Sequence, residues 1–365
     1  MRKKREMSYR VRILCGIISI MLGISMTACG RDSGDSDLQG QQVNGITDIT
    51  FSEDTKKITD GFSYVEYQGD YGFEDFLADG GASSDSEVTR FLTYNVFAEA
   101  EEMEFAKEAF GCSTVTVETP DGNRLFGRNY DGNQCNALVI KSTPKQGYAS
   151  IATVNTDFIK QGAGLASVFL NDDRMALAAL YAPLDGMNDA GFAISVNMIS
   201  DGEVIEQNTE KPDLTTTTAV RFLLNQAASV DDAIQLLGQY DLHSSMGMMI
   251  HFAMTDSTGH SVVVEYIDNE MVVTETPVVT NFYLTPGEKY GVGTEQSMER
   301  YNILIETISN HKLTEEDMRD ALDSVSKDNF VDSSTTEWSI IFNLNTKEAI
   351  YYHREEYSKG YQFRI

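Results

Sequence analysis

The sequence predicts an α+β fold in which sheets and helices stack in layers. Strand-like alternation of apolar and polar residues dominates from residue 113 onward, helical patterns interrupt it, and strand patterns return near the C-terminus. The regular βαβ alternation that is typical of a parallel sheet is absent. The 365 residues are 41% hydrophobic and 23% charged, which suits one large globular domain with an accessory segment, or two domains.

A hairpin gives the clearest strand signal. Residues 113–119 and 124–130 alternate like strands, and the turn sequence Pro120-Asp121-Gly122-Asn123 joins them. Further strands are expected at 191–198, 248–256, 260–268, 339–343 and 349–352.

Helices are indicated by apolar residues that recur at helical spacing, at 217–227, 230–240, 295–309 and 314–325. Thr314 and Asp317 are placed as an N-terminal capping pair for the last of these. A helical pattern also lies within residues 87–110, and we expect Gly111 to end that helix as its C-terminal cap.

The N-terminus resembles a bacterial lipoprotein signal. Six basic residues precede a short apolar run, Ile13–Ile24, and Thr27-Ala28-Cys29 follows as a small-residue cleavage site. The apolar run is too short to span a bilayer. We therefore expect a signal peptide at 1–28, lipid on Cys29, and an extracytoplasmic protein anchored to the bacterial cell membrane. A plain secretory signal with a chance cysteine is the alternative.

The next residues divide into a tether and an ordered unit. Residues 29–45 are mostly Gly, Asp, Ser and Gln, as in flexible linkers. Strand-like alternation follows at 46–51 and 62–67. We expect residues 46–111 to form an ordered unit ahead of a main domain at 112–365.

The charge of the chain restricts its partners. The net charge is −28, and beyond Ala28 it is −33. A surface this acidic repels phosphate backbones, so nucleic acid is not an expected partner. Membrane contact is expected only through the lipid on Cys29.

Four cysteines are present, and two remain after export. Cys15 leaves with the signal peptide and Cys29 carries lipid, which leaves Cys112 and Cys135. A disulfide between these two is one possibility in an exported protein. A free, working thiol is the other. Cys135 lacks companion residues for chemistry, and we interpret it as structural.

Cys112 has the companions that a nucleophile needs. A reactive thiol requires a positive neighbour or an adjacent base. Arg128, on the second arm of the hairpin, supplies the charge. Cutting the chain between Gly111 and Cys112 would create an α-amine with a pKa of roughly 7.7–8.0, a suitable base. Asp131 is then placed to orient that amine. Taken alone, a cysteine such as Cys112 is more often a buried strand residue than a nucleophile, and it is the combination with Arg128 and Asp131 that favours catalysis.

These residues resemble the start of the mature chain in N-terminal-nucleophile hydrolases of linear amides. That superfamily holds choloylglycine hydrolases, penicillin V acylases, acid-ceramidase-like enzymes and isopenicillin-type acyltransferases. Five stretches resemble its motifs in order: Cys112-Ser113-Thr114 with Gly127-Arg128-Asn129-Tyr130-Asp131, Gly186–Ala193 running into Val196-Asn197, Val279-Thr280-Asn281, Ser297–Tyr301 with Arg300, and the closing hairpin from Glu337 to Tyr352.

The resemblance implies a four-layer αββα sandwich preceded by a prosegment, and a cysteine amidohydrolase acting on a small N-acylated amide. Cys112 attacks the carbonyl and its amine moves the proton. Asn197 stabilises the oxyanion, and Arg128 and Asp131 tune and orient the nucleophile. Two further residues, Asn281 and Arg300, complete the site. No cofactor is implied, and the five histidines lack metal-ligand spacing.

One departure from the resemblance concerns the substrate. Choloylglycine hydrolases begin essentially at the cysteine, whereas an ordered segment precedes Cys112 here. This difference favours the branches of the superfamily that have a cleaved prosegment. The sequence leaves open the acyl group and the amine of the substrate, and also the oligomeric state. We expect the upstream fragment to stay docked after cleavage. The alternatives are an acyltransferase using the same site with an amine acceptor, and a non-catalytic solute-binding lipoprotein.

Overall fold

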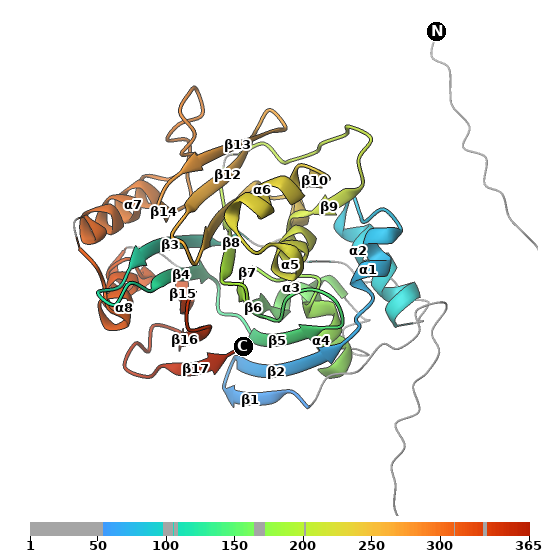
Figure 1. The fold of residues 1–365 in the computed structure, drawn as a ribbon, viewed down its shortest axis with the longest axis horizontal. Helices are drawn as coiled ribbons and strands as arrows, with labels where there is room; N and C mark the ends of the chain where they lie inside the picture. The colour runs from blue at the N-terminus through green and yellow to red at the C-terminus, as the bar shows by residue number, and fades with distance from the viewer. Residues whose placement is uncertain are drawn as a thin grey trace, which may run out of the picture. The chain divides into compact units, whose positions relative to one another are not determined.

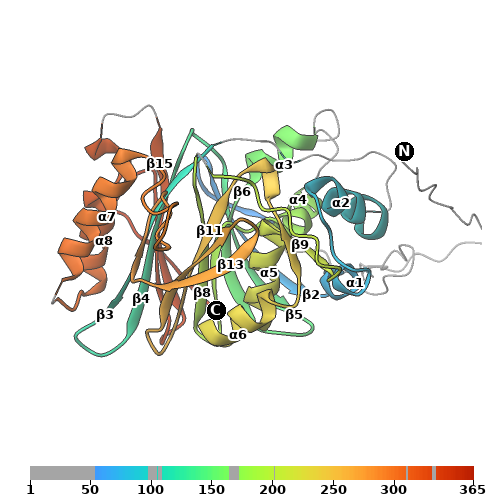
Figure 2. The same ribbon diagram turned by 90° about the horizontal axis from the view of Figure 1, so that it is seen from above.

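Two sheets face each other at the centre of the computed structural model (Figures 1 and 2). The nine-stranded sheet contains, in spatial order, β1 (Lys56–Thr59), β2 (Phe62–Gly69), β5 (Ala137–Pro144), β6 (Ser150–Asn155), β7 (Asp185–Asn188), β8 (Phe192–Met198), β11 (Ile250–Asp256), β12 (Ser261–Ile267) and β13 (Glu270–Glu275). The six-stranded sheet contains β14 (Val278–Val279), β3 (Gly111–Glu118), β4 (Arg124–Gly132), β15 (Thr335–Asn343), β16 (Glu348–His353) and β17 (Tyr361–Arg364). Within these two sheets, the described neighbouring strands are antiparallel except the parallel pair β2 and β5.

Helices cover the outer faces of both sheets. On the six-stranded sheet lie α7 (Glu295–Ile308) and α8 (Glu315–Ser324). The nine-stranded sheet carries α4 (Asp172–Ala179), α5 (Thr216–Gln226) and α6 (Val230–Leu237), with α3 (Thr156–Ala163) beside α4. Smaller elements are α1 (Phe73–Ala78), α2 (Asp85–Phe91), a π-helical turn at Leu92–Val96, 3₁₀ turns at Ser245–Gly247 and Lys327–Asn329, and the parallel pair β9 (Asp213–Thr215) and β10 (Asp241–His243). This four-layer order confirms the predicted αββα class.

The structure describes residues 54–97, 105, 109–163, 172–200, 202–309, 311–330 and 334–365. These residues belong to one unit that spans Gly40–Ile365. The predicted signal peptide, Cys29, the tether and the strand at 46–51 lie outside the described residues. None of the described helices is long and apolar enough to cross a membrane.

The predicted hairpin and most predicted elements are confirmed. Residues 113–119 and 124–130 fall in β3 and β4, and the capping box of Thr314 and Asp317 opens α8. The period of two in β3 divides its side chains between two environments, because successive side chains point to opposite faces. Cys112 packs in the larger apolar core, whereas Val115 packs with Leu322 of α8.

The expectation for residues 87–110 is wrong at its C-terminal end. Among the described residues the helical turns extend to Val96, and Gly111 is not a helix cap but the first residue of β3, paired with Asp131. A Cβ on Gly111 would lie 3.2 Å from both Cβ and Oδ2 of Asp131. Glycine at this position therefore serves close approach of the two strands rather than the end of a helix.

The segment upstream of Cys112 is built into the main fold. Strand β2 pairs with β5 along its full length, from Phe62 opposite Ala137 to Gly69 opposite Pro144. Phe62 is 1% exposed, and its ring stacks on Tyr351 of β16 with centroids 4.2 Å apart. The upstream segment thus shares one apolar core with the rest of the chain instead of forming a separate unit.

Candidate active site

Cys112 lies at the start of β3, with its thiol turned toward the space between the sheets. Its side chain is fully buried, and the Cys112 thiol donates to the Val196 carbonyl of β8 at 3.5 Å. Arg128 Nη2 donates to Cys112 Sγ at 3.1 Å. Both Cys112 and Cys135 are free thiols, so the possible disulfide between them is not formed.

Arg128 reaches the thiol from β4, and both of its terminal nitrogens are hydrogen-bonded. Its Nη1 donates to the Leu184 carbonyl at 2.7 Å and to Asp185 Oδ2 at 2.5 Å, and its Nη2 donates to the Val196 carbonyl at 2.9 Å. Burial lowers the pKa of Arg128, but Cys112 and Asp185 outweigh burial, so the pKa lies above its usual value. The guanidinium is therefore permanently charged and fixed in direction.

The environment of Cys112 in the intact chain disfavours the thiolate. Burial raises the pKa of the Cys112 thiol, and the opposing charge and hydrogen bond of Arg128 do not cancel that effect. Asp185 explains part of this balance, because it neutralises the guanidinium at close range. Because the thiol pKa is raised, a base is needed to activate Sγ.

The backbone nitrogen of Cys112 has a side-chain acceptor. Its N–H donates to Asn281 Oδ1 at 2.8 Å. Asn281 Oδ1 also accepts from Arg300 Nη2 at 2.9 Å, and Asn281 Nδ2 donates to the Met198 carbonyl at 2.7 Å. The opposite amide orientation would set its NH₂ against two donors, so these neighbours fix the direction of Asn281. Asn281 follows β14, which pairs with β3 and carries the amide alongside Cys112.

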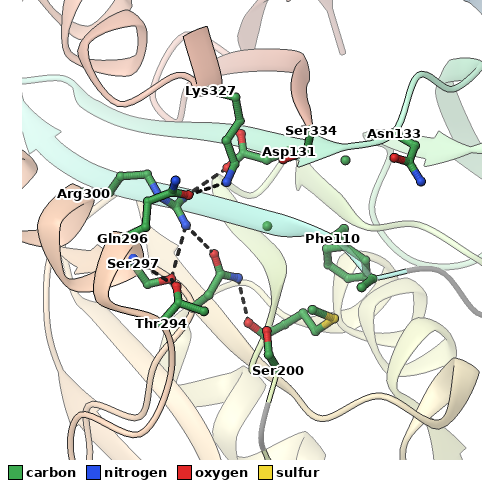
Figure 3. A pocket seen from close by; sticks show the side chains of 15 residues that line it. Phe110, Asp131, Asn133, Ser200, Thr294, Gln296, Ser297, Arg300, Lys327 and Ser334 are labelled. Carbon is green, nitrogen blue, oxygen red and sulfur yellow. Dashed lines mark hydrogen bonds and ion pairs between the residues drawn. The ribbon is translucent and has the colours of Figure 1, made fainter. Parts of the chain in front are cut away.

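Arg300 links the Cys112 carbonyl, Asp131 and Asn281, which is the acceptor of the Cys112 N–H. Figure 3 shows Arg300 among the polar side chains that line the neighbouring cavity. Arg300 lies on the buried face of α7 with Ser297 and Leu304, at the spacing of one helical stripe. Arg300 Nη1 donates to the Cys112 carbonyl at 2.8 Å and to Asp131 Oδ2 at 3.1 Å.

Asp131 faces the helices rather than the thiol. Its Oδ1 accepts from Thr336 Oγ1 at 2.8 Å, and its Oδ2 accepts from Arg300. In the intact chain the acceptor for the Cys112 N–H is therefore Asn281. The expected role of Asp131 in orienting a free amine stays a prediction for the cleaved chain.

Asn197 stands apart from the other predicted site residues. Its Nδ2 donates to Thr114 Oγ1 at 3.4 Å and to the Val279 carbonyl at 3.2 Å, and Ser195 Oγ donates to its Oδ1 at 3.1 Å. The structure thus brings together Cys112, Arg128, Asp131, Asn281 and Arg300 in one network. Within the described part of the chain, Asn197 makes no hydrogen bond to those five, and it donates to the strand that precedes Asn281.

A buried pair supports the segment that carries Asn281. His251 Nδ1 lies 2.8 Å from Glu265 Oε1, and His251 Nε2 lies 2.7 Å from the Thr280 carbonyl. Glu265 also accepts from the backbone N–H groups of Leu284 and Thr285. Burial raises the pKa of Glu265, but the bonds from His251 and the 284–285 backbone outweigh it and leave the pKa lowered.

A cavity of about 490 Å³ opens beside the Gly111–Cys112 bond (Figure 3). Polar side chains of α7 line one wall, and the upstream residues before Cys112 line another. The lining includes Phe110, Gly111, Asp131, Asn281, Arg300 and Lys327. Across the described ranges, no group of three or more His, Cys, Asp or Glu side chains is placed to hold a metal ion.

Two residues of the network were missed by the sequence interpretation. Asp185 pairs with Arg128 and also accepts from Trp338 Nε1 at 3.0 Å, and Thr336 holds Asp131. A signal for Asp185 existed, because it directly precedes the Gly186-Met187-Asn188 motif and a buried arginine needs an acid. Thr336 had no comparable signal.

Comparison with known families shows to which family the chain belongs. The model of the family "Linear amide C-N hydrolases, choloylglycine hydrolase family" matches residues 112–320, more than half of the 365 residues. The chain belongs to that family. The matched region begins at Cys112 itself, which agrees with the motif order in the sequence.

Members of the choloylglycine hydrolase family are also found among sequence relatives and solved structures. A penicillin V acylase from Pectobacterium atrosepticum is 28% identical over 124 residues, which are 31% of this chain and 32% of the relative. The match therefore spans about a third of that relative's length. The fold resembles penicillin V acylase from Agrobacterium tumefaciens (TM-score 0.50, 16% identity, 66% of this chain and 83% of that one). It equally resembles a mutant conjugated bile acid hydrolase from Clostridium perfringens (TM-score 0.50, 16% identity, 70% and 92%).

Proposed function

We propose that this protein is a self-processing cysteine amidohydrolase that cleaves the linear amide bond of an N-acylated small molecule. The observation that carries the proposal is that two separate side chains form hydrogen bonds with Cys112. Its Sγ accepts from Arg128 at 3.1 Å, while its backbone N–H donates to Asn281 at 2.8 Å. A buried structural cysteine needs neither contact. Membership of the linear amide hydrolase family supports the same reaction class.

Self-cleavage would proceed by acyl transfer within Cys112. Sγ attacks the carbonyl carbon of Gly111, the S–C bond forms as the Gly111–Cys112 C–N bond breaks, and the thiol proton ends on the Cys112 nitrogen. Asn281 and Arg300 hold that nitrogen and the Cys112 carbonyl in place. Water then hydrolyses the thioester, which restores the thiol and leaves a carboxylate on Gly111.

The freed amine would then act as the base for substrate. Its pKa of roughly 7.7–8.0 lets it take the thiol proton near neutral pH. Sγ attacks the substrate carbonyl, the amine gives its proton to the leaving nitrogen, and water releases the acyl group. Arg128 stabilises the developing thiolate at Sγ. Asn197 is proposed as an oxyanion donor, which requires it to turn from Thr114 toward the reacting carbonyl.

We further propose that the protein is held at the membrane by lipid on Cys29 and that the cleaved upstream fragment stays docked. The parallel pairing of β2 with β5 and the burial of Phe62 support the docking. Releasing the fragment would remove two strands from the nine-stranded sheet and expose their apolar faces to water.

Intact-mass measurement of full-length protein extracted in mild detergent tests the self-processing. Two fragments that meet at Gly111/Cys112, and a single uncut chain for Cys112→Ala, are expected. An uncut wild-type chain that hydrolyses amides would contradict self-processing, and cleavage of Cys112→Ala would show that another protease cuts the chain.

A further inference from the structure

The residue two positions before Cys112 fills an aromatic niche next to the thiol. Phe110 is 3% exposed. Its ring stacks on Tyr130 with centroids 5.3 Å apart and planes 28° apart, and it lies against Phe158 of α3 at 6.3 Å. Tyr130 in turn stacks on Trp338 at 3.9 Å and 6°.

This niche is adjacent to the nucleophile. Tyr130 is the cross-strand partner of Cys112, and such side chains lie side by side on one face with Cβ atoms ~4.5–5.5 Å apart. Arg128, which holds Sγ, lies with its guanidinium carbon 5.6 Å from the centre of the Tyr130 ring. The Phe110 ring therefore packs against an aromatic side chain that itself borders the thiol.

We propose that the niche of Phe110, formed by Tyr130 and Phe158, is the acyl-side subsite of the processed enzyme, and that it accepts an aromatic ring carried on the acyl chain. The inference rests on the proposed function. In self-cleavage the acyl group transferred to Sγ is that of Gly111, and Phe110 is part of it. A substrate forms the same kind of thioester on the same sulfur, so its acyl group extends from Sγ over the same surface.

Because the Phe110 ring fills this niche, the end of the upstream fragment competes with the substrate for the acyl-side subsite. After cleavage, the fragment ending in Phe110-Gly111 still presents its ring to the niche, and a substrate ring must displace it. Tyr130 offers a flat face, and Trp338 stacks on Tyr130 and holds that face in place. A flat aromatic face favours a planar ring over a saturated one of similar size. The substrate class is thus an amide whose acyl chain carries an aromatic group at a reach similar to that of the Phe110 ring from the Gly111 carbonyl.

Two matched anilides test the subsite on processed full-length protein. N-acetyl-phenylalanyl-glycyl anilide reproduces the upstream end, and N-acetyl-alanyl-glycyl anilide lacks only the ring. We expect kcat/KM to be about tenfold or more higher for the phenylalanyl anilide, since burial of a phenylalanine ring is worth at least that factor. Phe158→Ala should reduce this preference to about threefold or less, because part of the niche wall is lost.

Two further variants complete the test. Tyr290→Ala removes an aromatic side chain that is 60% exposed, and it should retain the full preference. Phe110→Ala weakens the internal competitor, so its kcat/KM per processed site should rise for the phenylalanyl anilide. Equal hydrolysis of both anilides by the wild type would overturn the subsite and leave the proposed function standing. Hydrolysis of neither anilide by fully processed protein would overturn both.

Discussion

Asp185 Oδ2 lies 2.5 Å from Arg128 Nη1, and both side chains are fully buried. Burial is the largest cause of the raised pKa of the Cys112 thiol, and this pair limits how far Arg128 opposes it. Without Asp185, the guanidinium 3.1 Å from Sγ would stabilise a thiolate in the resting enzyme. With Asp185 present, its carboxylate largely neutralises the positive charge of Arg128, and the Cys112 thiol needs a base to become a thiolate.

The first prediction follows from that pair. Asp185→Asn removes the neutralising charge, so the pKa of the Cys112 thiol should fall and alkylation of the processed protein should begin at lower pH. The unpaired buried guanidinium should also cost about 3–5 kcal/mol of unfolding free energy. Alkylation rate against pH and denaturant unfolding measure the two effects. Asp320→Asn, at an exposed pair with Arg319, is the control and should change neither. A raised thiol pKa in Asp185→Asn would contradict this charge balance.

The second prediction concerns Asn281. Asn281→Ala removes the acceptor of the Cys112 N–H and a partner of Arg300. We expect self-cleavage to slow by about 10²–10³-fold, the loss typical of one positioned polar group in an active site. The uncut fraction over time, measured by intact mass, reports the rate. Asn302→Ala, on the exposed face of the same helix as Arg300, should process at the wild-type rate. Normal processing of Asn281→Ala would exclude a role for this amide in the cleavage.

The third prediction uses the lowered pKa of Glu265. A depressed carboxyl pKa contributes stability that is present above the unfolded value and is lost as pH falls through the folded value. Unfolding free energy of the wild type should therefore decrease below about pH 4.5. Glu265→Gln should show a shallower decrease, because it has no carboxylate to protonate. Parallel pH curves for the two proteins would show that Glu265 titrates normally.

The same variant should affect catalysis through Asn281. His251 and Glu265 hold the backbone on both sides of Asn281, at Thr280 and at Leu284. Loosening that segment should lower kcat by about tenfold with little change in KM, as expected when a catalytic group loses its fixed position. His251→Asn should give the same split. A change confined to KM would assign the pair to substrate binding instead.

The fourth prediction tests the docking of the upstream fragment. Phe62→Ala empties a core position, and the loss should be about 3–5 kcal/mol. In processed protein the variant should also let the two fragments separate during gel filtration, whereas wild-type fragments should elute together. Ile58→Ala, at a 37% exposed position in the neighbouring strand, is the matched control and should leave the fragments together. Separation of the wild-type fragments in buffer would show that docking does not persist after cleavage.

Local sequence patterns were sufficient for most of the fold. The turn at 120–123 and the amphipathic stripes of α5 to α8 are coded within a few residues, and they form as predicted. The pattern at 87–110 failed at its C-terminal end, because Gly111 belongs to β3 and pairs with Asp131 instead of ending a helix. Gly111 was misassigned because its cross-strand neighbour, Asp131, lies 20 residues further along the chain, and a local sequence pattern does not show that pairing.

The order of the motifs predicted the residues of the site. It did not predict the buried partners that hold those residues in place. Arg128 and Asp185 are 57 residues apart, and His251 and Glu265 are 14 apart on adjacent strands. Such pairings depend on strand register, which a single sequence does not specify. For Asn197 the motif was recognised, but the position of its side chain was not predicted. In the intact chain its amide donates to Thr114.

The central claim is that Cys112 carries the acyl group. Processed protein should be mixed with an amide substrate, quenched in acid within the first turnover, and analysed by intact mass and peptide mapping. We predict a hydroxylamine-sensitive acyl adduct on the N-terminal peptide that begins at Cys112, and its disappearance as hydrolysis is completed. Full turnover by Cys112→Ala, or an adduct on any other residue, would contradict the account.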